Sequence, residues 1–393
     1  MISEKMRELV ANGSAIRAMF EEGKKMAAEF GAENVYDYSL GNPSVAPPKE
    51  VNDAIKEVLN EDPVFLHGYM NNSGYDDVRQ SVAESLNRRF ETNFFKRNIL
   101  MTVGAAGGLN VILKTLLNPG DEVIVFAPFF GEYKNYVDNF QGKLVVVDTE
   151  KETFQPNLED FMKKITDKTK AVIINNPNNP TGVIYEEKTI MAISEILYKA
   201  QNAFDHSIYI ISDEPYRELV YTDVEVPYLT KYYENTIVGY SFSKSLSLPG
   251  ERIGYLVMPD ELDGADEIID GANIANRVLG FVNAPSLMQR VIQKVLDVRV
   301  DVSVYDKNRE LLYNSLSDYG FEMAKPQGAF YMFMKSMEED DKAFCQKAKE
   351  HHLLLVPGSS FGCPGYVRLA YCVDYDMIKR SLPAFEKLAK EYQ

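Results

Sequence analysis

Apolar runs alternate with helix-like stretches over much of the chain. Six short runs, rich in β-branched residues and bounded by polar or turn-forming residues, have the character of buried strands. They are Glu122–Phe126, Leu144–Val147, Ala171–Ile174, Ile208–Ile211, Thr236–Val238 and Tyr255–Met258. Segments 78–90 and 191–200 carry apolar residues at helical spacing. Because strands that alternate with helices form mostly parallel sheets covered on both faces, the pattern predicts an α/β domain.

The pattern changes after about Asn283. We expect a long helical stretch over residues 285–319, apolar strands over 328–334 and 366–372, and a helix at the C-terminal end. These elements do not continue the earlier alternation, so they predict a second, smaller α+β domain. A chain of 393 residues is long enough for such an arrangement, with ample core.

Polar segments follow two of the predicted strands. The run Ala171–Ile174 leads into Asn-Asn-Pro-Asn-Asn-Pro-Thr-Gly at 175–182, and Ile208–Ile211 leads into Ser-Asp-Glu-Pro-Tyr at 212–216. Either segment alone could simply end its strand, because Asn and Pro are common in turns. In open α/β sheets, however, ligands bind at the carboxyl ends of the strands. The two segments are therefore candidates for one binding site.

A third segment adds reactive chemistry. Residues 241–254 read Ser-Phe-Ser-Lys-Ser-Leu-Ser-Leu-Pro-Gly-Glu-Arg-Ile-Gly, so Lys244 lies among serines and is followed by a Pro-Gly turn and Arg252. An amine that forms a Schiff base needs a site that also holds an anion, and hydroxyls with a guanidinium do this for phosphate. In isolation the segment would also suit a solvated loop.

In this order the three segments resemble those of the fold-type I pyridoxal-phosphate aminotransferases, class I/II (the aspartate aminotransferase superfamily), and the resemblance extends over nearly the whole chain. It implies a large domain with a mostly parallel, seven-stranded-type sheet covered by helices, plus a smaller α+β domain. We expect residues 46–284 to form the large cofactor-binding domain, and residues 1–45 with 285–393 to form the discontinuous small one. The implied cofactor is pyridoxal 5′-phosphate (PLP).

The resemblance also assigns the residues around the cofactor ring. Lys244 would form the Schiff base, and Asp213 would pair with the pyridine nitrogen, keeping it protonated so that the ring can accept electrons. Tyr216 and Asn179 match the pair that hydrogen-bonds the phenolic oxygen of the ring. Phe130 matches the position that stacks on the ring, although a phenylalanine beside a second phenylalanine also suits a core position.

The phosphate would be held by a glycine-rich helix start together with basic and hydroxyl groups. Residues 104–108, Gly-Ala-Ala-Gly-Gly, precede apolar residues at helical spacing, and such a start lets backbone N–H groups approach an anion. Many relatives carry a hydroxyl residue here, whereas this chain has alanines, so more of the anchoring would fall on side chains elsewhere. The implied set is Gly104, Ala105, Ala106, Ser241, Ser243, Arg252 and, across a dimer interface, Tyr69.

Substrate recognition points to Arg368. It lies in an apolar predicted strand, where an unpaired charge is costly, so an anionic partner is expected even without the resemblance. Arg368 matches the arginine that binds the substrate α-carboxylate, and Asn179 and Gly41 match residues that border the substrate. A dicarboxylic substrate would need a second cation. Arg277 and Arg17 are candidates for it, and no motif fixes either.

The implied activity is transfer of an amino group between an L-amino acid and a 2-oxo acid such as 2-oxoglutarate. The donor would be aspartate or one of a broad set that includes aromatic amino acids. We expect ping-pong kinetics with Lys244 as Schiff-base lysine and general base, and a homodimer with shared active sites. A β-C–S lyase acting on cystathionine-like substrates would use the same residues and is the alternative.

Composition limits which partners and which cellular compartment are expected for this chain. A net charge of −16 disfavours nucleic acid and anionic membranes as partners, and no window reaches 18 consecutive apolar residues. Three cysteines and four histidines show no metal-ligand spacing. The N-terminus carries charges throughout, unlike a secretory signal. We therefore expect a cytoplasmic enzyme without a metal. The acidic balance also disfavours a DNA-binding regulator built on the same fold.

Overall fold

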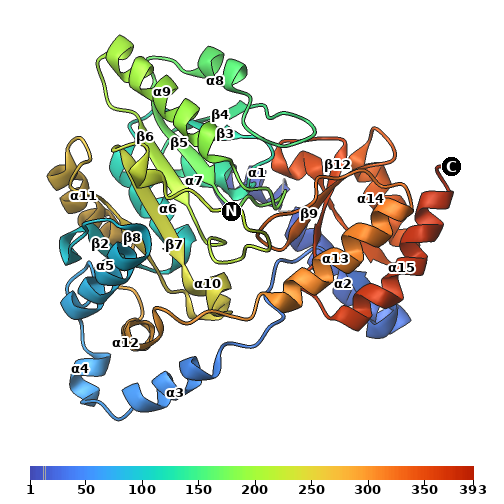
Figure 1. Ribbon diagram of the computed structural model, residues 1–393, viewed down its shortest axis with the longest axis horizontal. Helices are drawn as coiled ribbons and strands as arrows, with labels where there is room; N and C mark the ends of the chain where they lie inside the picture. The colour runs from blue at the N-terminus through green and yellow to red at the C-terminus, as the bar shows by residue number, and fades with distance from the viewer. Residues whose placement is uncertain (12, 14) are drawn as a thin grey trace.

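Most of the large sheet runs in one direction. The computed structural model describes residues 1–11, 13 and 15–393, and within them seven strands form a mixed sheet in the order β2-β8-β7-β6-β5-β3-β4. Strand β8 alone runs against the others, so the expected mostly parallel sheet is confirmed (Figure 1). The strands are β2 (Ile99–Thr102), β3 (Glu122–Phe126), β4 (Lys143–Val147), β5 (Thr169–Asn175), β6 (Tyr209–Asp213), β7 (Thr236–Ser241) and β8 (Gly254–Val257).

Helices cover both faces of this sheet. Along β3, Val123 and Val125 lie in a core with α6, α7 and α11, whereas Ile124 and Phe126 lie in a core with α8 and α9. Alternate residues of a strand point to opposite faces, and every residue of β3 is buried because both faces are covered. The helices are α6 (Gly104–Leu116), α7 (Glu132–Asn139), α8 (Leu158–Lys164), α9 (Glu187–Phe204) and α11 (Ala265–Val278).

A third core covers the β2–β8 end of the sheet. Its helices are α3 (Lys49–Val58), α4 (Pro63–His67), α5 (Asp76–Phe90) and α12 (Ser286–Val295). The stretch expected to be helical, residues 285–319, does contain helices. The structure has two helices there, α12 and α13 (Ser303–Asp318), separated by residues 296–302. The two helices contribute to different cores, which explains the break.

The C-terminal elements form a separate antiparallel sheet in the order β11-β12-β9. Strands are present in both regions where the sequence predicts them, 328–334 and 366–372. A core of apolar residues from Val300 to Ala389 joins this sheet to its helices. The elements are β9 (Tyr331–Lys335), β11 (Val356–Pro357), β12 (Tyr366–Ala370), α14 (Asp341–Glu350) and α15 (Tyr375–Lys390), together with α13.

The N-terminal segment lies against the C-terminal elements. Strand β1 (Tyr36–Asp37) pairs in parallel with β10 (Leu353–Leu354), and the Tyr38 hydroxyl lies 2.7 Å from Ser381 Oγ inside the C-terminal core. Figure 1 shows α2 and α15 on the same side of the molecule. The remaining elements are α1 (Glu4–Ala11), α2 (Ala15–Phe30), and the 3₁₀ helices η1 (Ala32–Asn34), η2 (Lys96–Asn98), η3 (Leu229–Lys231), η4 (Pro249–Glu251) and η5 (Gly358–Phe361).

The division into residues 46–284 and residues 1–45 with 285–393 stays a prediction. The position of Tyr38 in the C-terminal core is in keeping with a discontinuous small domain. Helix α12, which that division assigns to the small domain, packs with α3 and α5 beside the large sheet instead. Its packing favours a boundary closer to residue 300.

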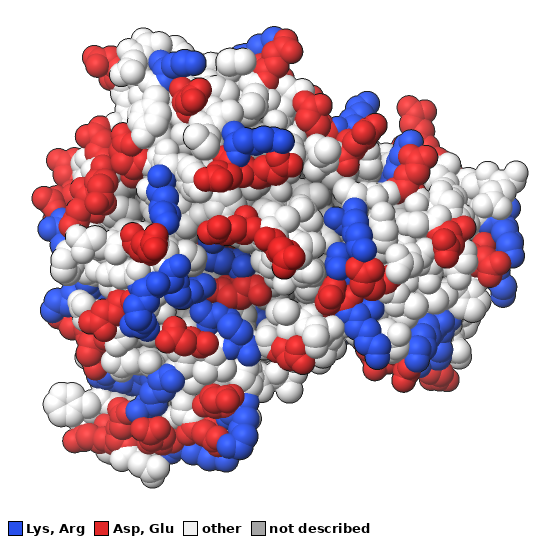
Figure 2. All heavy atoms as spheres, in the orientation of Figure 1, with Lys and Arg blue, Asp and Glu red and all other residues white. Residues whose placement is uncertain are grey.

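The visible surface mixes both signs of charge. Figure 2 shows Lys and Arg side chains interspersed with Asp and Glu over this face, in keeping with the acidic overall balance. No helix within residues 1–11 and 15–393 has the length and apolar character needed to cross a membrane.

Candidate active site

Three neighbouring strands end at one edge of the large sheet, and the predicted site residues follow them. Asn175 ends β5, Asp213 ends β6 and Ser241 ends β7, and the strand register pairs Asn175 with Asp213. Parallel strands bring their carboxyl ends together, which is where ligands bind in α/β sheets. Lys244 lies on α10 (Phe242–Ser245), the short helix that follows β7. The three polar segments singled out from the sequence are thus neighbours in the fold.

The Lys244 amine is held inside the protein. Its Nζ donates a hydrogen bond to the Gly41 carbonyl at 2.8 Å and lies 5.2 Å from the centroid of the Phe330 ring. Burial lowers the pKa of this amine to about 8, and the guanidinium groups of Arg252 and Arg368 act in the same direction. The neutral amine is therefore accessible near physiological pH, as a nucleophile or general base requires.

Asp213 is buried with one carboxylate oxygen bonded and the other not. Oδ2 accepts a hydrogen bond from the Tyr133 hydroxyl at 2.5 Å, while Oδ1 has no hydrogen-bond partner among the described residues. Burial raises the pKa of this carboxyl to about 7, although the Tyr133 hydrogen bond opposes the shift. A buried acceptor without a donor is costly. The arrangement indicates a position kept for a donor group on a ligand.

Tyr216 and Asn179 lie together beside this carboxylate. Asn179 Nδ2 is 3.5 Å from the Tyr216 hydroxyl, which lies 3.0 Å from the hydroxyl of Tyr331. The Asn179 backbone N–H donates to Asn175 Oδ1 at 2.7 Å, which fixes the turn after β5. Burial raises the pKa of Tyr216 well above its ordinary value. Its phenol therefore stays protonated and can donate a hydrogen bond.

Arg368 enters the site from β12. Its Nη1 donates to Asn179 Oδ1 at 3.2 Å and its Nη2 to the Ser39 carbonyl at 2.6 Å, while Nε has no partner among the described residues. The guanidinium carbon lies 4.6 Å from the centroid of the Tyr331 ring. Burial lowers the pKa of this guanidinium, the sign of a charge placed where water does not solvate it.

Arg368 differs from the other buried arginines. Within residues 1–11, 13 and 15–393 the buried arginines are Arg79, Arg217, Arg309 and Arg368. The first three each form an ion pair with a carboxylate, and Arg368 forms none. An unpaired buried charge is expensive unless an anion completes it. Among the described residues, Arg368 is thus the buried arginine whose charge no carboxylate of the protein balances.

Gly104 and Arg252 form a second anion-binding feature. Gly104 begins α6 with φ +78°, and a Cβ at this position would lie 2.7 Å from Arg252 Nη2. Only glycine lets the helix start approach the guanidinium so closely. Ser241 and Ser243 are buried at the start of α10. Backbone N–H groups at a helix N-terminus favour an anion, and a guanidinium adds charge-assisted hydrogen bonds.

Comparison with known proteins decides the family. Residues 32–385 match the family model described as aminotransferase class I and II. This chain belongs to that family. The aminotransferase is 31% identical to a probable aspartate aminotransferase of Methanocaldococcus jannaschii, over 99% of this chain and 100% of that protein. It is 30% identical to aromatic-amino-acid aminotransferase 2 of Thermococcus litoralis, over 97% of each chain.

Solved structures agree with the sequence relatives. An aminotransferase from Eubacterium rectale is 48% identical, with a TM-score of 0.98 over 100% of this chain and 99% of that one. Aspartate aminotransferase from Thermotoga maritima is 29% identical, with a TM-score of 0.87 over 98% of this chain and 99% of that one. The fold expected from the resemblance is therefore confirmed.

The side chains of this aminotransferase fit the cofactor on which the family depends, PLP. The unpartnered Oδ1 of Asp213 suits the protonated ring nitrogen, which is a donor. The Lys244 amine has the lowered pKa that carbonyl chemistry needs. The Gly104 helix start with the Arg252 guanidinium suits the phosphate. Each of these features is a property of the protein alone.

The remaining predicted cofactor residues lie in three places. Phe130 is partly buried, and its ring packs edge-on against Tyr133 with centroids 5.5 Å apart, next to the bonded side of Asp213. Ala105 and Ala106 lie in the first turn of α6, where they offer backbone groups only. Tyr69 is 95% exposed and has no part in the site of its own chain.

The two candidates for a second cation, Arg277 and Arg17, lie on helices at the surface. Arg277 lies in the last turn of α11 and Arg17 in the first turns of α2, and both are exposed. No hydrogen bond or ion pair among the described residues joins either side chain to the cluster around Lys244. Their role in substrate selection stays a prediction.

Sequence reasoning missed several residues that touch the site. The Tyr133 hydroxyl hydrogen-bonds to Asp213. The Tyr331 hydroxyl hydrogen-bonds to that of Tyr216, and its ring faces the Arg368 guanidinium. The Phe330 ring lies next to the Lys244 amine. Tyr133 stands in the same Phe-Phe-Gly-Glu-Tyr segment as Phe130, one helical turn further on, so its position could have been proposed. Tyr331 lies on a strand that the sequence predicts, and nothing in its own pattern marks it as polar-facing.

Proposed function

We propose that this aminotransferase binds PLP at Lys244 and moves an amino group between an L-amino acid and a 2-oxo acid. The observation that carries the proposal is Arg368, a buried arginine with no carboxylate partner among the described residues. It donates to the Asn179 side chain, which in turn lies beside Tyr216. An α-carboxylate would complete its hydrogen bonding through the planar, bidentate geometry that guanidinium groups favour.

Each residue of the site has a definite task in this reaction. When bound, PLP supplies the electron sink that stabilises negative charge at the substrate Cα. Asp213 holds the proton of the ring nitrogen through its Oδ1, and the resulting ion pair would lower its pKa from the raised value of the protein alone. Lys244, neutral in part near pH 8, takes the Cα proton as general base. Tyr216 and Asn179 donate hydrogen bonds to the phenolic oxygen.

The phosphate would be held at the start of α6. Gly104, Ala105 and Ala106 offer backbone N–H groups, and Arg252 offers its guanidinium. The hydroxyls of Ser241 and Ser243 lie at the start of α10, one helical turn or less from Lys244. Ala105 and Ala106 add no hydroxyl group, so the guanidinium and the serines carry more of the anchoring.

We further propose a homodimer with shared sites, in which Tyr69 of each subunit reaches the phosphate held by the other. Its side chain is 95% exposed, and Val64 and Phe65 on the nearby α4 are 79% and 78% exposed. Large apolar side chains left in water close together favour a protein contact. The expected result of analytical ultracentrifugation is a dimer, and a monomer with full activity would contradict this part of the proposal.

The substrates proposed are aspartate, or a broad set including aromatic amino acids, with 2-oxoglutarate as acceptor. Relatives named for aspartate and for aromatic amino acids lie at nearly equal identity, 31% and 30%. A panel of amino donors, each offered with 2-oxoglutarate and with pyruvate and scored by keto-acid formation, tests the choice. The C–S lyase alternative predicts pyruvate and ammonia from cystathionine with no amino acceptor present.

Replacement of the lysine tests the core of the proposal. Lys244→Ala removes the proposed general base, so kcat should fall by about 10⁴-fold, the upper range of what a positioned acid or base contributes. The control is Lys335→Ala, since Lys335 is exposed and, among the described residues, forms its ion pair with Glu322 alone. Substantial transamination by Lys244→Ala protein would contradict the proposal.

A further inference from the structure

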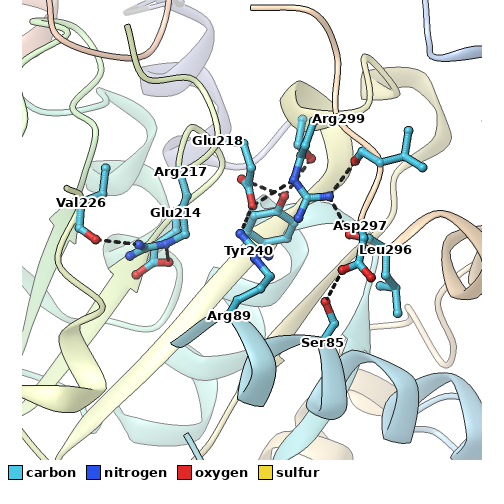
Figure 3. Close-up of polar contacts among 12 residues, drawn as sticks. Ser85, Arg89, Glu214, Arg217, Glu218, Val226, Tyr240, Leu296, Asp297 and Arg299 are labelled. Carbon is cyan, nitrogen blue, oxygen red and sulfur yellow. Dashed lines mark hydrogen bonds and ion pairs between the residues drawn. The ribbon is translucent and has the colours of Figure 1, made fainter. Parts of the chain in front are cut away.

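A buried carboxylate joins three segments behind the Lys244 helix. Glu218 lies five positions after Asp213 in the chain, and its side chain is 7% exposed. It accepts hydrogen bonds from Arg89 on α5 and, at 3.0 Å, from the Tyr240 hydroxyl on β7. Arg299 Nε lies 3.5 Å away, on the connection from α12 to α13. Figure 3 shows these side chains converging on Glu218.

Tyr240 extends this cluster to the helix that carries the lysine. Its hydroxyl oxygen lies 2.7 Å from Ser245 Oγ, and both side chains are buried. The Tyr240 hydroxyl has one hydrogen to donate. Because the Glu218 carboxylate can only accept, that hydrogen is donated to Glu218, and the Ser245 hydroxyl donates to the Tyr240 oxygen. Burial and the nearby Glu218 raise the pKa of Tyr240 well above its ordinary value, so the phenol keeps its hydrogen. Ser245 is the residue next to Lys244.

The same serine is tied to the connection between α12 and α13. The Val300 backbone N–H donates to the Ser245 carbonyl at 2.9 Å, and the neighbouring Arg299 reaches Glu218. Arg299 Nη1 also donates to the Leu296 and Val298 carbonyls at 2.5 and 2.6 Å, which holds this segment in one conformation. Ser245 is therefore restrained both through its hydroxyl and through its carbonyl.

Helix α10 depends on such restraints. It has four residues, and helices this short are not stable on their own in water. Within the helix, Ser241 Oγ accepts from the Ser243 N–H at 3.1 Å, which caps the start but leaves the end to other contacts. The end is where Ser245 meets Tyr240 and Val300. The contacts of Ser245 therefore add restraints from outside the helix to the backbone hydrogen bonds of its last turn.

We propose that Glu218 is a positioning residue for Lys244, acting through Tyr240 and Ser245. The inference rests on the proposed role of Lys244. The chain of contacts also relates the turn bearing Asp213 and Tyr216 to the helix bearing the lysine, because Glu218 belongs to that turn. Loss of a link would leave the substrate-binding arginine in place and misplace the amine. Misplacement of a reacting group by about 1 Å can cost about 100-fold in rate.

The variant Tyr240→Phe tests the proposal in the holoenzyme. It keeps the ring, which stacks on Tyr255 at 4.9 Å, and removes only the hydroxyl. We expect kcat to fall about tenfold, a part of the loss that full misplacement causes, with KM changed less than about twofold. The pH midpoint of the cofactor's visible absorbance should move by about half a unit, because the surroundings of the amine change.

The chain offers a matched control in Tyr233→Phe. The Tyr233 hydroxyl is likewise buried and donates to the Ile208 carbonyl at 2.7 Å, near the end of β6 opposite Asp213. Tyr240→Phe loses two buried hydrogen bonds and Tyr233→Phe loses one, so the unfolding free energy should fall in both variants and by more in Tyr240→Phe. Only Tyr240→Phe should change kcat and the absorbance midpoint. Equal kcat and equal midpoints in the two variants would overturn the proposal.

Two further variants test the same proposal if Tyr240→Phe proves poorly stable. Ser245→Ala should reproduce its effect on kcat and on the midpoint, and the double variant should be no worse than the more affected single variant, because both break one contact chain. Strictly additive losses would overturn the proposal. A different result would contradict the proposed function itself: turnover that survives in Lys244→Ala protein.

Discussion

Asp213 and Glu214 are adjacent in the chain, and both are buried, yet their surroundings are opposite. Glu214 accepts hydrogen bonds on both oxygens, from Ser212 Oγ at 2.7 Å and from Arg217 Nε. Asp213 has one oxygen bonded and Oδ1 without a partner among the described residues. Two adjacent residues at the end of β6 thus carry one carboxylate that the protein completes and one whose Oδ1 has no partner among the described residues.

The arginines repeat this contrast. Arg217 is 7% exposed and fully satisfied, because it pairs with Glu214 and donates to the Val226 and Pro227 carbonyls. Arg368 is 2% exposed and has no carboxylate partner within the described residues. Burial is therefore no guide to function here. The useful distinction is between buried polar groups that are completed inside the protein and those that are not.

The largest expected effect comes from matched Arg→Met variants. Arg217→Met leaves Glu214 as an uncompensated buried charge and should cost about 3–5 kcal/mol of unfolding free energy. Arg368→Met removes an unpaired charge and should leave stability unchanged or higher. Its kcat/KM should fall by about 30-fold to 5,000-fold, because losing one partner of a buried charge pair costs about 2–5 kcal/mol. Urea unfolding and steady-state kinetics measure both quantities for both variants.

The two variants should therefore differ in opposite ways: Arg217→Met should lose stability and Arg368→Met should lose activity. Folded Arg217→Met protein should retain its kcat/KM, since the hydrogen-bond partners of the Arg217 side chain among the described residues are Glu214, Val226 and Pro227, and none of them is assigned to the site. If Arg368→Met lost as much stability as Arg217→Met while keeping its activity, the contrast between the two arginines would be wrong.

An intermediate effect is expected from Asp213→Asn in cofactor-free protein. Burial raises the pKa of Asp213 from 3.8 to about 7, so the folded state binds the proton more tightly than the unfolded state does. The stability that this carboxyl contributes is complete below pH 4 and is lost as the pH rises to about 7, by roughly 1.4 kcal/mol per pKa unit. Asparagine does not titrate. The unfolding free energy of the variant should therefore rise relative to that of the wild type between pH 5 and pH 8.

Urea unfolding at pH 5 and at pH 8 measures the difference in unfolding free energy between Asp213→Asn and the wild type. Glu214→Gln serves as the control, because Arg217 completes that carboxylate. A stability difference for Asp213→Asn that did not vary with pH would show that the carboxyl is not held in an uncharged state by burial.

The smallest effect is expected at the phosphate end. Gly104→Ala places a Cβ 2.7 Å from Arg252 Nη2 at φ +78°, whereas Gly120→Ala meets nothing within 4 Å at φ +90°. Both substitutions strain a left-handed residue by about 1 kcal/mol. Only Gly104→Ala should weaken PLP binding, by about tenfold, the equivalent of about 1.4 kcal/mol. Cofactor titration followed by absorbance measures it, and equal affinities in the two variants would refute the phosphate assignment.

Much of the fold could be predicted from the sequence because most strands of the large sheet are buried on both faces, the edge strand β4 excepted. Such strands are continuous apolar runs, and Glu122–Phe126 is found with the bounds that the pattern predicts. Strand β2 was missed, since its four residues carry little pattern. The break between α12 and α13 was missed because both helices have apolar faces and only their packing against different cores separates them.

The site was predictable to the extent that it follows strand ends. Lys244, Asp213 and Asn179 stand in short polar segments directly after apolar runs, and the sheet brings them together. Tyr331 and Ser39 reach the site from elements far away in the chain, through contacts that no local pattern records. Glu218 was missed for the same reason. Its partners Arg89, Tyr240 and Arg299 come from three separate regions.

The most direct test of the central claim is to locate the cofactor on the chain. Holoenzyme reduced with borohydride and digested should yield one PLP-labelled peptide, which should contain Lys244 within the segment Ser-Phe-Ser-Lys-Ser at 241–245. The label should be absent from Lys244→Ala protein treated in the same way. A labelled lysine elsewhere in the chain, with Lys244 unmodified, would contradict the account.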